Sequence, residues 1–500
     1  MNSLTRKVGT VYLVGAGPGH PGLITRMGYD LLQHCDAVAY DALIPLELVA
    51  SLPERVERHY VGRRAGRHSM PQAEKNQLLV DLALRGLNVV RLKGGDTAFF
   101  GGSAEEAQCL TAAGVRVVVV PGVTAASAVA AASGLPLTDR RGASWVVFAT
   151  GHGSSSEPIP VPWQEIAGLR GGTIVIYMGL ANLEEIVHQM LAGGCPADTP
   201  CMVVQGVSTG TQRIETSKLD QVVEDCRHKQ LKPPALVVVG QVVQHRTLAG
   251  PPMLPLAGKR ILVTCCPQEV ESVCAILRDR GAEPLPYPTF LLQDCPDTEI
   301  WTRFAAVASA GGWCVFASET EVQTFLCALL RNSLDFRSFG KLKIAAFGAG
   351  AKSALLEKGI RADIFYPSPQ QKFSLRDLNW DGESIPANLV LISKEVQIDA
   401  SEWTEIMEMT LVCAKPATWE PHWEQEVQNT PPELILFNNP AAVDGYVHIL
   451  GQAAAHSLAL KSRVIVTSET TAQAARRSSL PCIVDEKFLQ AISGGNNCAE

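Results

Sequence analysis

The sequence lacks the patterns that mark metalloproteins and disulfide-rich secreted proteins. Its 14 cysteines are scattered along 500 residues, with no C-x-x-C pair and no histidine at ligand spacing. We therefore expect neither a bound metal nor a disulfide framework. The N-terminal stretch MNSLTRKVGTVYLV lacks a separate apolar core followed by a small-residue cleavage site, so it gives no sign of an export signal. These absences favour a reduced, cytoplasmic protein.

An excess of positive charge is missing as well. The formal net charge of −7 argues against nucleic-acid binding, which favours a basic domain or stripe. One uncharged run, residues 117–137, has the length of a membrane span, but Pro121-Gly122 and Gly134-Leu135-Pro136 divide it. We expect a short strand and a short helix in a buried core there, and no membrane segment.

A glycine-rich turn follows the first strand-like run, in VYLVGAGPGHPGLIT (11–25). Glycines after a buried strand let a ligand approach the backbone closely. A dinucleotide fingerprint counted from Gly15 needs glycine or alanine at position 20, which is His20, and Pro18 removes an N–H that a pyrophosphate needs. The turn predicts a nucleoside-like ligand without a diphosphate. A tight turn without a ligand, and an NAD-dependent oxidoreductase with Asp41 on the ribose, are the alternatives.

Strand-like and helical runs alternate along the chain, which predicts an α/β fold with parallel sheets. A linker without charge, residues 247–258, precedes a fresh strand at Arg260. Beyond the linker, WCVFASETEVQTFLCALL and LILFNNPAAVDGYVHIL are two versions of one strand–turn–helix pattern, and IAAFGAGAKSALLEKG and VIVTSETTAQAAR are two of another. This half is predicted to form two related α/β lobes. The expected strands are 11–15, 36–40, 88–92, 115–120, 145–150, 173–178, 200–205 and 235–240.

Polar residues mark the ends of several predicted strands. Asp41 ends the second strand, where it can cap a turn, bind a ribose or act as a general base. Residues 60–72 concentrate arginines, which suit an anionic ligand, although a solvated loop is equally compatible. Gly94-Gly95-Asp96 forms a second glycine turn, where the carboxylate suits a hydroxyl or amino group and repels phosphate. Pro121 to Thr124 forms a third, and three such turns predict one crevice.

Nine motifs carry a family resemblance: GAGPGHPGLIT, AVAYDALI, YVGRRAGRHSMPQ, VRLKGGDTAFFGG, VVPGVTAASA, GLPLTDR, ATGH, IYMGLANL and PPALVVVG. In this order they resemble the tetrapyrrole methylases, in particular the uroporphyrinogen-III C-methyltransferases, over residues 8–245. The resemblance implies two α/β domains, S-adenosylmethionine in the crevice between them, a homodimer, and methylation of uroporphyrinogen III to precorrin-2 without a metal.

The resemblance also implies roles for individual residues. Asp41 matches the proposed proton acceptor, and Arg63 stands where the family has lysine. Arginines are expected to bind the substrate carboxylates, namely Arg63, Arg64, Arg67, Arg140 and Arg141. The expected cofactor-binding residues are Pro18, Gly94, Gly95, Asp96, Phe99, Thr124, Ala125, Met178, Val207 and Ala235.

The sequence departs from the family pattern at several positions. His20 replaces an acidic residue, Asp139 replaces a histidine, and the second glycine loop loses a proline and an arginine. Arg63 can supply charge but cannot readily donate a proton, because a guanidinium stays protonated. A slower or altered enzyme, or a non-catalytic tetrapyrrole-binding protein, is the alternative that these departures favour.

The half from about residue 259 resembles the uroporphyrinogen-III synthases. KRILVTCCPQEVESVCAILRDRGAEPLPYP follows their opening, FASETEV and FNNPAAV follow their internal motifs, and Thr470-Thr471-Ala472 follows another. The resemblance implies conversion of hydroxymethylbilane to uroporphyrinogen III, with Ser318, Asn438 and Thr470 as candidate site residues. A retained binding or scaffolding lobe is the alternative.

The predicted domains follow from these boundaries. Residues 8–137 and 138–246 form the two methylase domains, and 247–258 is the linker. Residues 259–500 form the synthase-like part, with one lobe from 259–292 and 432–500 and the other from 300–415.

Overall fold

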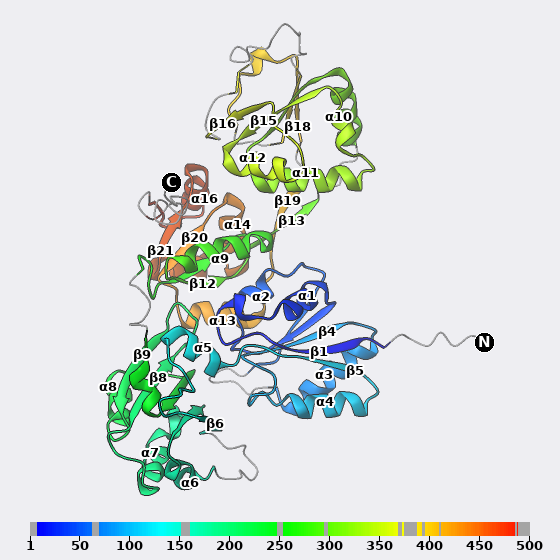
Figure 1. Ribbon diagram of the computed structural model, residues 1–500. Helices are drawn as coiled ribbons and strands as arrows, with labels where there is room; N and C mark the ends of the chain where they lie inside the picture. The colour runs from blue at the N-terminus through cyan, green and yellow to red at the C-terminus, as the bar shows by residue number, and fades with distance from the viewer. Residues whose placement is uncertain are drawn as a thin grey trace, which may run out of the picture. The chain divides into compact units, whose positions relative to one another are not determined.

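The computed structural model divides the chain into two compact units, Met1–Thr289 with Ala417–Glu500 and Phe290–Pro416. Figure 1 shows both units, and each is described by itself below. The structure describes residues 8–62, 70–151, 161–247, 254–294, 299–368, 373–374, 388–392, 396–409, 412–485 and 488. The predicted α/β class with parallel sheets is confirmed in both units.

The first sheet of the larger unit has five parallel strands in the order β3-β2-β4-β1-β5. Its inner strands β1 and β2 are apolar runs, and β4 is apolar apart from Arg91 and Lys93, because both faces of the sheet are covered. The strands are β1 (Thr10–Gly15), β2 (Ala37–Tyr40), β3 (Glu57–Tyr60), β4 (Val89–Lys93) and β5 (Arg116–Val120). The helical segments are η1 (Pro21–Leu23), α1 (Arg26–His34), α2 (Glu47–Ala50), α3 (Gln72–Leu84), α4 (Ser103–Ala112) and α5 (Ala125–Ser133).

Two points about this sheet bear on the predictions. The uncharged run 117–137 is divided, as predicted, into the end of β5 and the short helix α5. β3 was not predicted, because its half-buried residues ERHY show no apolar pattern.

Among the described helices, none combines the length and the hydrophobicity needed to cross a lipid bilayer.

A second, mixed sheet follows in the order β6-β7-β10-β8-β9. β6 and β7 are parallel, and the other neighbours are antiparallel. The edge strand β9 was not predicted, because its sequence RIETSK is polar and has no buried residue. The elements are β6 (Trp145–Thr150), α6 (Trp163–Gly168), β7 (Gly172–Tyr177), η2 (Leu180–Asn182), α7 (Leu183–Ala192), β8 (Pro200–Gln205), β9 (Arg213–Lys218), α8 (Val222–His228), β10 (Ala235–Val239) and η3 (Gln241–His245).

The third sheet, β12-β11-β20-β21-β22, is parallel and joins segments that are far apart in the sequence. Its first elements are β11 (Arg260–Val263), η4 (Pro267–Glu269), α9 (Val270–Asp279) and β12 (Glu283–Pro286). Its later elements are α13 (Pro421–Asn429), β20 (Leu434–Phe437), α14 (Pro440–Leu450), α15 (Gln452–Lys461), β21 (Arg463–Val466), α16 (Glu469–Arg477) and β22 (Ile483–Val484).

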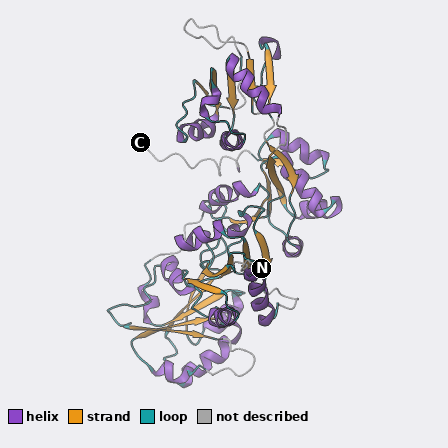
Figure 2. Cartoon of the chain, turned by 90° about the vertical axis from the view of Figure 1, so that its right-hand side faces the viewer, coloured by secondary structure: helices purple, strands orange, loops and turns teal. Residues whose placement is uncertain are grey.

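The smaller unit has a parallel sheet in the order β16-β15-β14-β17-β18 and a separate antiparallel pair, β13 with β19. Its strands are β13 (Phe290–Asp294), β14 (Gly312–Phe316), β15 (Leu342–Phe347), β16 (Ile364–Tyr366), β17 (Asn388–Leu391), β18 (Glu405–Glu408) and β19 (Val412–Pro416). Its helical segments are α10 (Glu299–Ala310), α11 (Glu319–Arg331), η5 (Phe336–Phe339), α12 (Gly348–Glu357) and η7 (Ala400–Glu402). Figure 2 distinguishes its strands from its helices by colour.

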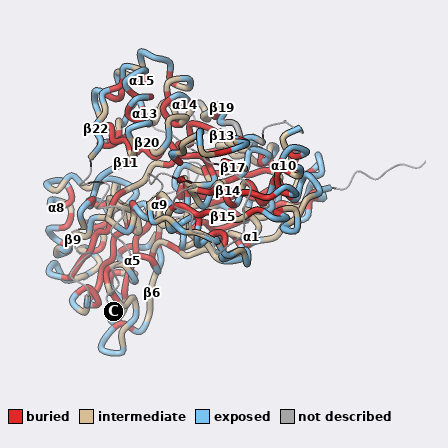
Figure 3. The backbone as a smooth tube through the Cα atoms, turned by 90° about the horizontal axis from the view of Figure 1, so that it is seen from above, coloured by how far each residue is buried: buried red, intermediate tan, exposed pale blue. Residues whose placement is uncertain are grey.

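The core of each sheet is made by its central strands. Figure 3 shows β14 and β15 as a largely buried pair, and Trp313, Phe316 and Phe347 on these strands are fully buried. The repeated patterns seen in the sequence are also visible as repeated structure. β14 leads into α11 and β20 into α14, each helix capped by a side chain, that of Ser318 or of Asn439.

Candidate active site

Three glycine turns meet at the carboxyl edge of the first sheet. Gly17 and Gly95 exchange backbone hydrogen bonds of 3.1 and 2.8 Å, so the turns after β1 and β4 are paired. A Cβ added to Gly15 would lie 2.7 Å from Gly122 Cα, which belongs to the turn after β5. The turns therefore pack backbone against backbone, which only glycine allows at these positions. This is the edge at which open parallel sheets bind ligands.

The buried carboxylate of Asp96 ties two of these turns together. Its Oδ2 accepts a 2.8 Å hydrogen bond from Gly122 N, and its Oδ1 accepts one of the same length from Ala98 N. Because each oxygen already binds a backbone amide, Asp96 shapes the turns after β4 and β5. Its acceptor lone pairs that remain can still meet a ligand.

Residues of the second sheet and its loops add a wall to this edge. A Cβ on Gly19 would lie 2.6 Å from the carbonyl oxygen of Val207, so the first turn abuts the loop after β8. Tyr177, the last residue of β7, places its hydroxyl 2.7 Å from Thr124 Oγ1 and accepts a 3.1 Å hydrogen bond from Ala126 N. The phenol thus caps α5, and burial raises the pKa of Tyr177.

Exposed apolar side chains and residues with unusual backbone geometry surround the turns. Phe99 stacks edge-on against Phe148 with ring centroids 5.4 Å apart, yet it remains 38% exposed, and Met178 is 52% exposed. Phe100, Met178 and Ser208 have positive φ angles of 55°, 51° and 65°. Such conformations cost about 1–3 kcal/mol each in non-glycine residues and cluster at ligand sites.

His20 has a structural role in the first turn. Its Nδ1 accepts a 2.9 Å hydrogen bond from Gly22 N and caps the short helix η1. A ring nitrogen accepts a hydrogen bond only when it carries no proton. Burial lowers the pKa of His20, which favours this neutral form of the ring. A histidine acceptor can therefore cap the turn in which the family pattern has an acid.

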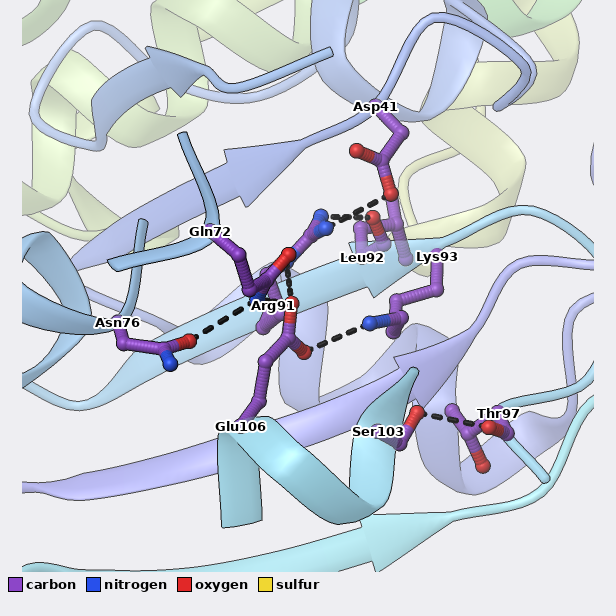
Figure 4. A network of polar contacts seen from close by, with 9 residues as sticks. All are labelled: Asp41, Gln72, Asn76, Arg91, Leu92, Lys93, Thr97, Ser103 and Glu106. Atoms are coloured by element: carbon purple, nitrogen blue, oxygen red, sulfur yellow. Dashed lines mark hydrogen bonds and ion pairs between the residues drawn. The ribbon is translucent and has the colours of Figure 1, made fainter. Parts of the chain in front are cut away.

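Asp41 follows β2 and belongs to a network of buried charges (Figure 4). Its Oδ2 accepts a 2.8 Å hydrogen bond from Arg91 Nη2. Arg91 Nε in turn lies 3.3 Å from Glu106 Oε1, and Lys93 Nζ lies 2.7 Å from Glu106 Oε2. Asp41 remains 27% exposed, whereas Arg91, Lys93 and Glu106 are 5% exposed or less in their side chains. The network therefore runs from a solvent-reachable carboxylate into the protein interior.

The charges in this network stabilise one another. Burial by itself raises the pKa of Glu106, but the positive charges of Arg91 and Lys93 outweigh it and the pKa is lowered. Burial, together with the charge of Arg91, lowers the pKa of Lys93, and Glu106 counteracts this change. A guanidinium is always protonated, so Arg91 presents a permanent cation to Asp41.

The expected cofactor residues come from elements of both the first and the second sheet. Gly94 packs against the loop that begins with Asp41. A Cβ on Gly94 would lie 3.3 Å from the carbonyl oxygen of Leu43, two residues after Asp41. Pro18 lies in the first turn, Ala125 begins α5, and Ala235 begins β10 beside the loop that carries Val207.

The expected substrate-binding arginines are placed less uniformly. Arg63, Arg64 and Arg67 lie outside the described residues. Arg140 is exposed, and Arg141 is paired with Asp139 in its own turn, at 2.5 Å between Nη2 and Oδ2.

In the synthase-like part, Ser318 caps α11 in a capping box with Glu321. Asn438 donates a 2.9 Å hydrogen bond to Glu269, and Thr470 lies 2.8 Å from Ser468, both distances between side-chain polar atoms. Local structure therefore accounts for Ser318, while Asn438 directly follows β20 and Thr470 lies in the first turn of α16, the helix after β21.

Four residues of the site were missed in the sequence: Arg91, Lys93, Glu106 and Tyr177. A usable signal existed for the first two, because NVVRLK places two cations in an otherwise apolar strand. Charges buried in a strand need a partner, but nothing in the sequence indicated that Glu106 is that partner.

Comparison with known proteins agrees with this architecture. The family model described as Tetrapyrrole (Corrin/Porphyrin) Methylases matches residues 10–223, and that of Uroporphyrinogen-III synthase HemD matches residues 271–394. The uroporphyrinogen-III C-methyltransferase of Bacillus subtilis (strain 168) is 33% identical over 368 residues, which cover 73% of this chain and 75% of that protein. The chain therefore belongs to the tetrapyrrole methylase family, and both predicted resemblances are confirmed.

Two further similarities define the extent of the likeness. The porphyrin biosynthesis protein HemD of Ruminiclostridium josui is 29% identical over 98% of this chain and 99% of its own. The uroporphyrin-III C-methyl transferase of Thermus thermophilus, solved with S-adenyl homocysteine, is 37% identical over 47% of this chain and 94% of its own, with a TM-score of 0.41. The chain spans about half the length of the siroheme synthases that it matches, 51% for that of Gluconobacter oxydans (strain 621H).

Proposed function

We propose that the methylase half transfers methyl groups from S-adenosylmethionine to carbon atoms of uroporphyrinogen III and so forms precorrin-2. One observation carries the proposal. In a member of the tetrapyrrole methylase family, three glycine turns and Asp41 meet at the carboxyl edge of one parallel sheet. That edge combines a close backbone approach for a nucleoside with a carboxylate for proton transfer.

S-adenosylmethionine fits the residues of this edge. The backbone of Gly95 has a φ of +72°, and a Cβ there would meet nothing within 4 Å, so its backbone borders open space. Phe99 and Met178 offer exposed apolar surface to a flat base. When bound, the cofactor supplies a methyl group on a sulfonium sulfur and leaves as a thioether once that methyl has bonded to a substrate carbon.

Asp41 is proposed to accept the proton that the methylated ring loses. Arg91 fixes the orientation of this carboxylate through its 2.8 Å hydrogen bond. The arginines Arg64, Arg67, Arg140 and Arg141 are proposed to bind substrate carboxylates, and Arg63 adds positive charge without donating a proton.

We propose further that the synthase-like part converts hydroxymethylbilane to uroporphyrinogen III, the substrate of the methylase half. The match of residues 271–394 to the uroporphyrinogen-III synthases supports this second activity. The domain boundaries given in the sequence analysis and a homodimer formed through the methylase half are part of the same proposal. Light scattering on the purified full chain tests the dimer, and a monomer mass would exclude it.

The decisive experiment supplies hydroxymethylbilane and S-adenosylmethionine to the full chain and identifies every product. Precorrin-2 is expected. Uroporphyrinogen III without methylated products would restrict the protein to synthase activity, and methylation of added uroporphyrinogen III alone would restrict it to the methylase. Binding of tetrapyrrole without any product would leave a binding protein.

An NAD-dependent oxidoreductase is the competing function. Its ribose contact would have to be Asp41, whose Oδ2 is bonded to Arg91, and Pro18 lacks the N–H that a pyrophosphate uses. Calorimetric titration with both cofactors separates the two functions. Tight binding of NAD without binding of S-adenosylmethionine would overturn the methylase proposal.

A further inference from the structure

We propose that Glu106 is a positioning residue that acts on Asp41 through Arg91, an inference that rests on the proposed methyl transfer. Glu106 lies on α4 and is 1% exposed, so it has no contact with solvent through which to meet a substrate. Any effect of Glu106 on the reaction is therefore transmitted by the side chains that it contacts.

The carboxylate of Glu106 fixes two cations of one strand. Its Oε2 accepts from Lys93 Nζ at 2.7 Å, and its Oε1 accepts from Arg91 Nε at 3.3 Å. Gln72 Nε2 lies 3.4 Å from the same Oε1. Both oxygens of this buried group are thus engaged, as its desolvation demands.

The guanidinium of Arg91 is held at three of its nitrogen atoms. Nε faces Glu106, Nη1 donates to the carbonyl oxygen of Leu92 at 3.0 Å, and Nη2 donates to Asp41 at 2.8 Å. Because the guanidinium is planar and rigid, fixing the first two nitrogens sets the direction in which the third points. Glu106 therefore helps to determine where the carboxylate of Asp41 lies.

Glu106 also connects Asp41 to the second glycine turn. Lys93 directly precedes Gly94, and Ser103 at the start of α4 donates a 2.7 Å hydrogen bond to the carbonyl oxygen of Thr97 at the end of that turn. Figure 4 shows these contacts around one helix end. The same helix thus holds both the proton acceptor and the proposed cofactor turn, whose relative placement decides the rate of an aligned transfer.

Charge balance gives the direction of the effect. Arg91 and Lys93 carry two positive charges, and Asp41 and Glu106 carry two negative ones. Without the charge of Glu106, Asp41 is the remaining negative partner of Arg91 in this network, and the carboxylate is drawn further inward. Asp41 is then both misplaced and less available as a base.

The test uses the full chain and the variants Glu106→Gln, Asp41→Asn and the double variant. In Glu106→Gln, kcat with uroporphyrinogen III is expected to fall on the order of 10²-fold, the cost of a misplacement of about 1 Å. The Kd of S-adenosylmethionine, measured by calorimetry, should change less than about twofold, since the hydrogen bond from Ser103 to Thr97 still holds the cofactor turn in this variant. Glu105→Gln is the matched control, because Glu105 is the exposed neighbour on the same helix; it should retain wild-type kcat.

The double variant distinguishes an effect of Glu106 on the position of Asp41 from a loss of activity that is independent of Asp41. If Glu106 acts through Asp41, Glu106→Gln costs nothing further once Asp41 is Asn. Loss by the same factor in both backgrounds, or a parallel loss of cofactor affinity, would overturn the inference. If Glu106→Gln does not fold, Arg91→Lys replaces it in the same cycle, because lysine keeps the charge but cannot span Glu106 and Asp41 together. Absence of methyl transfer by the wild-type chain would overturn the proposed function and the inference together, whereas additive effects on an active enzyme would overturn the inference alone.

Discussion

At the scale of single residues, the site depends on side chains that hold other side chains. Asp41 is held by Arg91, and Thr124 by Tyr177. In both pairs a buried or partly buried polar group is satisfied by a partner from a different strand. Such contacts fix geometry that a solvated side chain would not keep.

Replacement of Asp41 by alanine tests its role as base. Asp41→Ala is expected to keep its affinity for S-adenosylmethionine and to lose most turnover, because removal of a positioned general base typically costs 10²- to 10⁴-fold. Steady-state kinetics and calorimetry give the two numbers. Asp30→Ala is the control, since the ion pair of Asp30 with Arg26 is exposed and such pairs contribute little to stability. Unchanged turnover in Asp41→Ala would remove the proposed role.

Replacement of Tyr177 by phenylalanine tests the contact between β7 and the start of α5. Tyr177→Phe removes the hydroxyl that meets Thr124 and accepts from Ala126 N, so it is expected to destabilise the chain by about 1–3 kcal/mol by leaving buried groups unpaired. It is also expected to weaken binding of S-adenosylmethionine. Urea unfolding and calorimetry measure the two effects, and an unchanged cofactor Kd would show that Thr124 does not depend on Tyr177.

At the scale of elements, loop geometry and helix capping determine the local structure. Gly122 touches the neighbouring turns so closely that its replacement cannot be absorbed. A Cβ there would lie 2.4 Å from Gly95 O. The start of α11 likewise depends on one residue, Ser318, whose side chain forms a capping box with Glu321.

A single methyl group should therefore disrupt the site. Gly122→Ala is expected to destabilise the chain by about 1–3 kcal/mol and to weaken binding of S-adenosylmethionine. Gly168→Ala is the matched control, because its nearest contact would be an ordinary 3.5 Å from Gly193 O. Equal cofactor affinity in both variants would contradict the placement of the cofactor beside these turns.

Ser318→Ala tests whether the serine at the start of α11 serves structure or catalysis. Loss of the capping box is expected to destabilise the smaller unit by about 1 kcal/mol, while Ser318→Thr retains most of the stability. Denaturant unfolding provides the measurement. If formation of uroporphyrinogen III is abolished in a folded Ser318→Ala chain, the serine has a role beyond capping.

At the scale of the whole molecule, the buried charges make stability depend on pH. The folded-state pKa of Glu106 is lowered from its usual 4.5, so Glu106 stabilises the protein above about pH 4.5 and this contribution is lost as the pH falls through the lowered value. At neutral pH, Glu106→Gln is expected to cost about 3–5 kcal/mol, because it leaves buried cations without a counter-charge. Urea unfolding of wild type and variant should give a difference that shrinks below pH 4.5, and a constant difference would contradict this assignment.

The sequence by itself determined the α/β class, the family and the apolar strands of the methylase half, because alternating apolar runs and glycine turns are local requirements of the backbone. It also placed Asp41 and the three glycine turns at strand ends. It could not show that Asp41 meets Arg91, 50 residues away, or that Thr124 meets Tyr177, 53 residues away. Such pairs arise because neighbouring strands need not be consecutive in the chain, and burial then forces each charged or polar group to find the partner that the fold brings beside it. The tertiary structure alone thus decided which side chains hold the proposed base and the proposed cofactor turns in place.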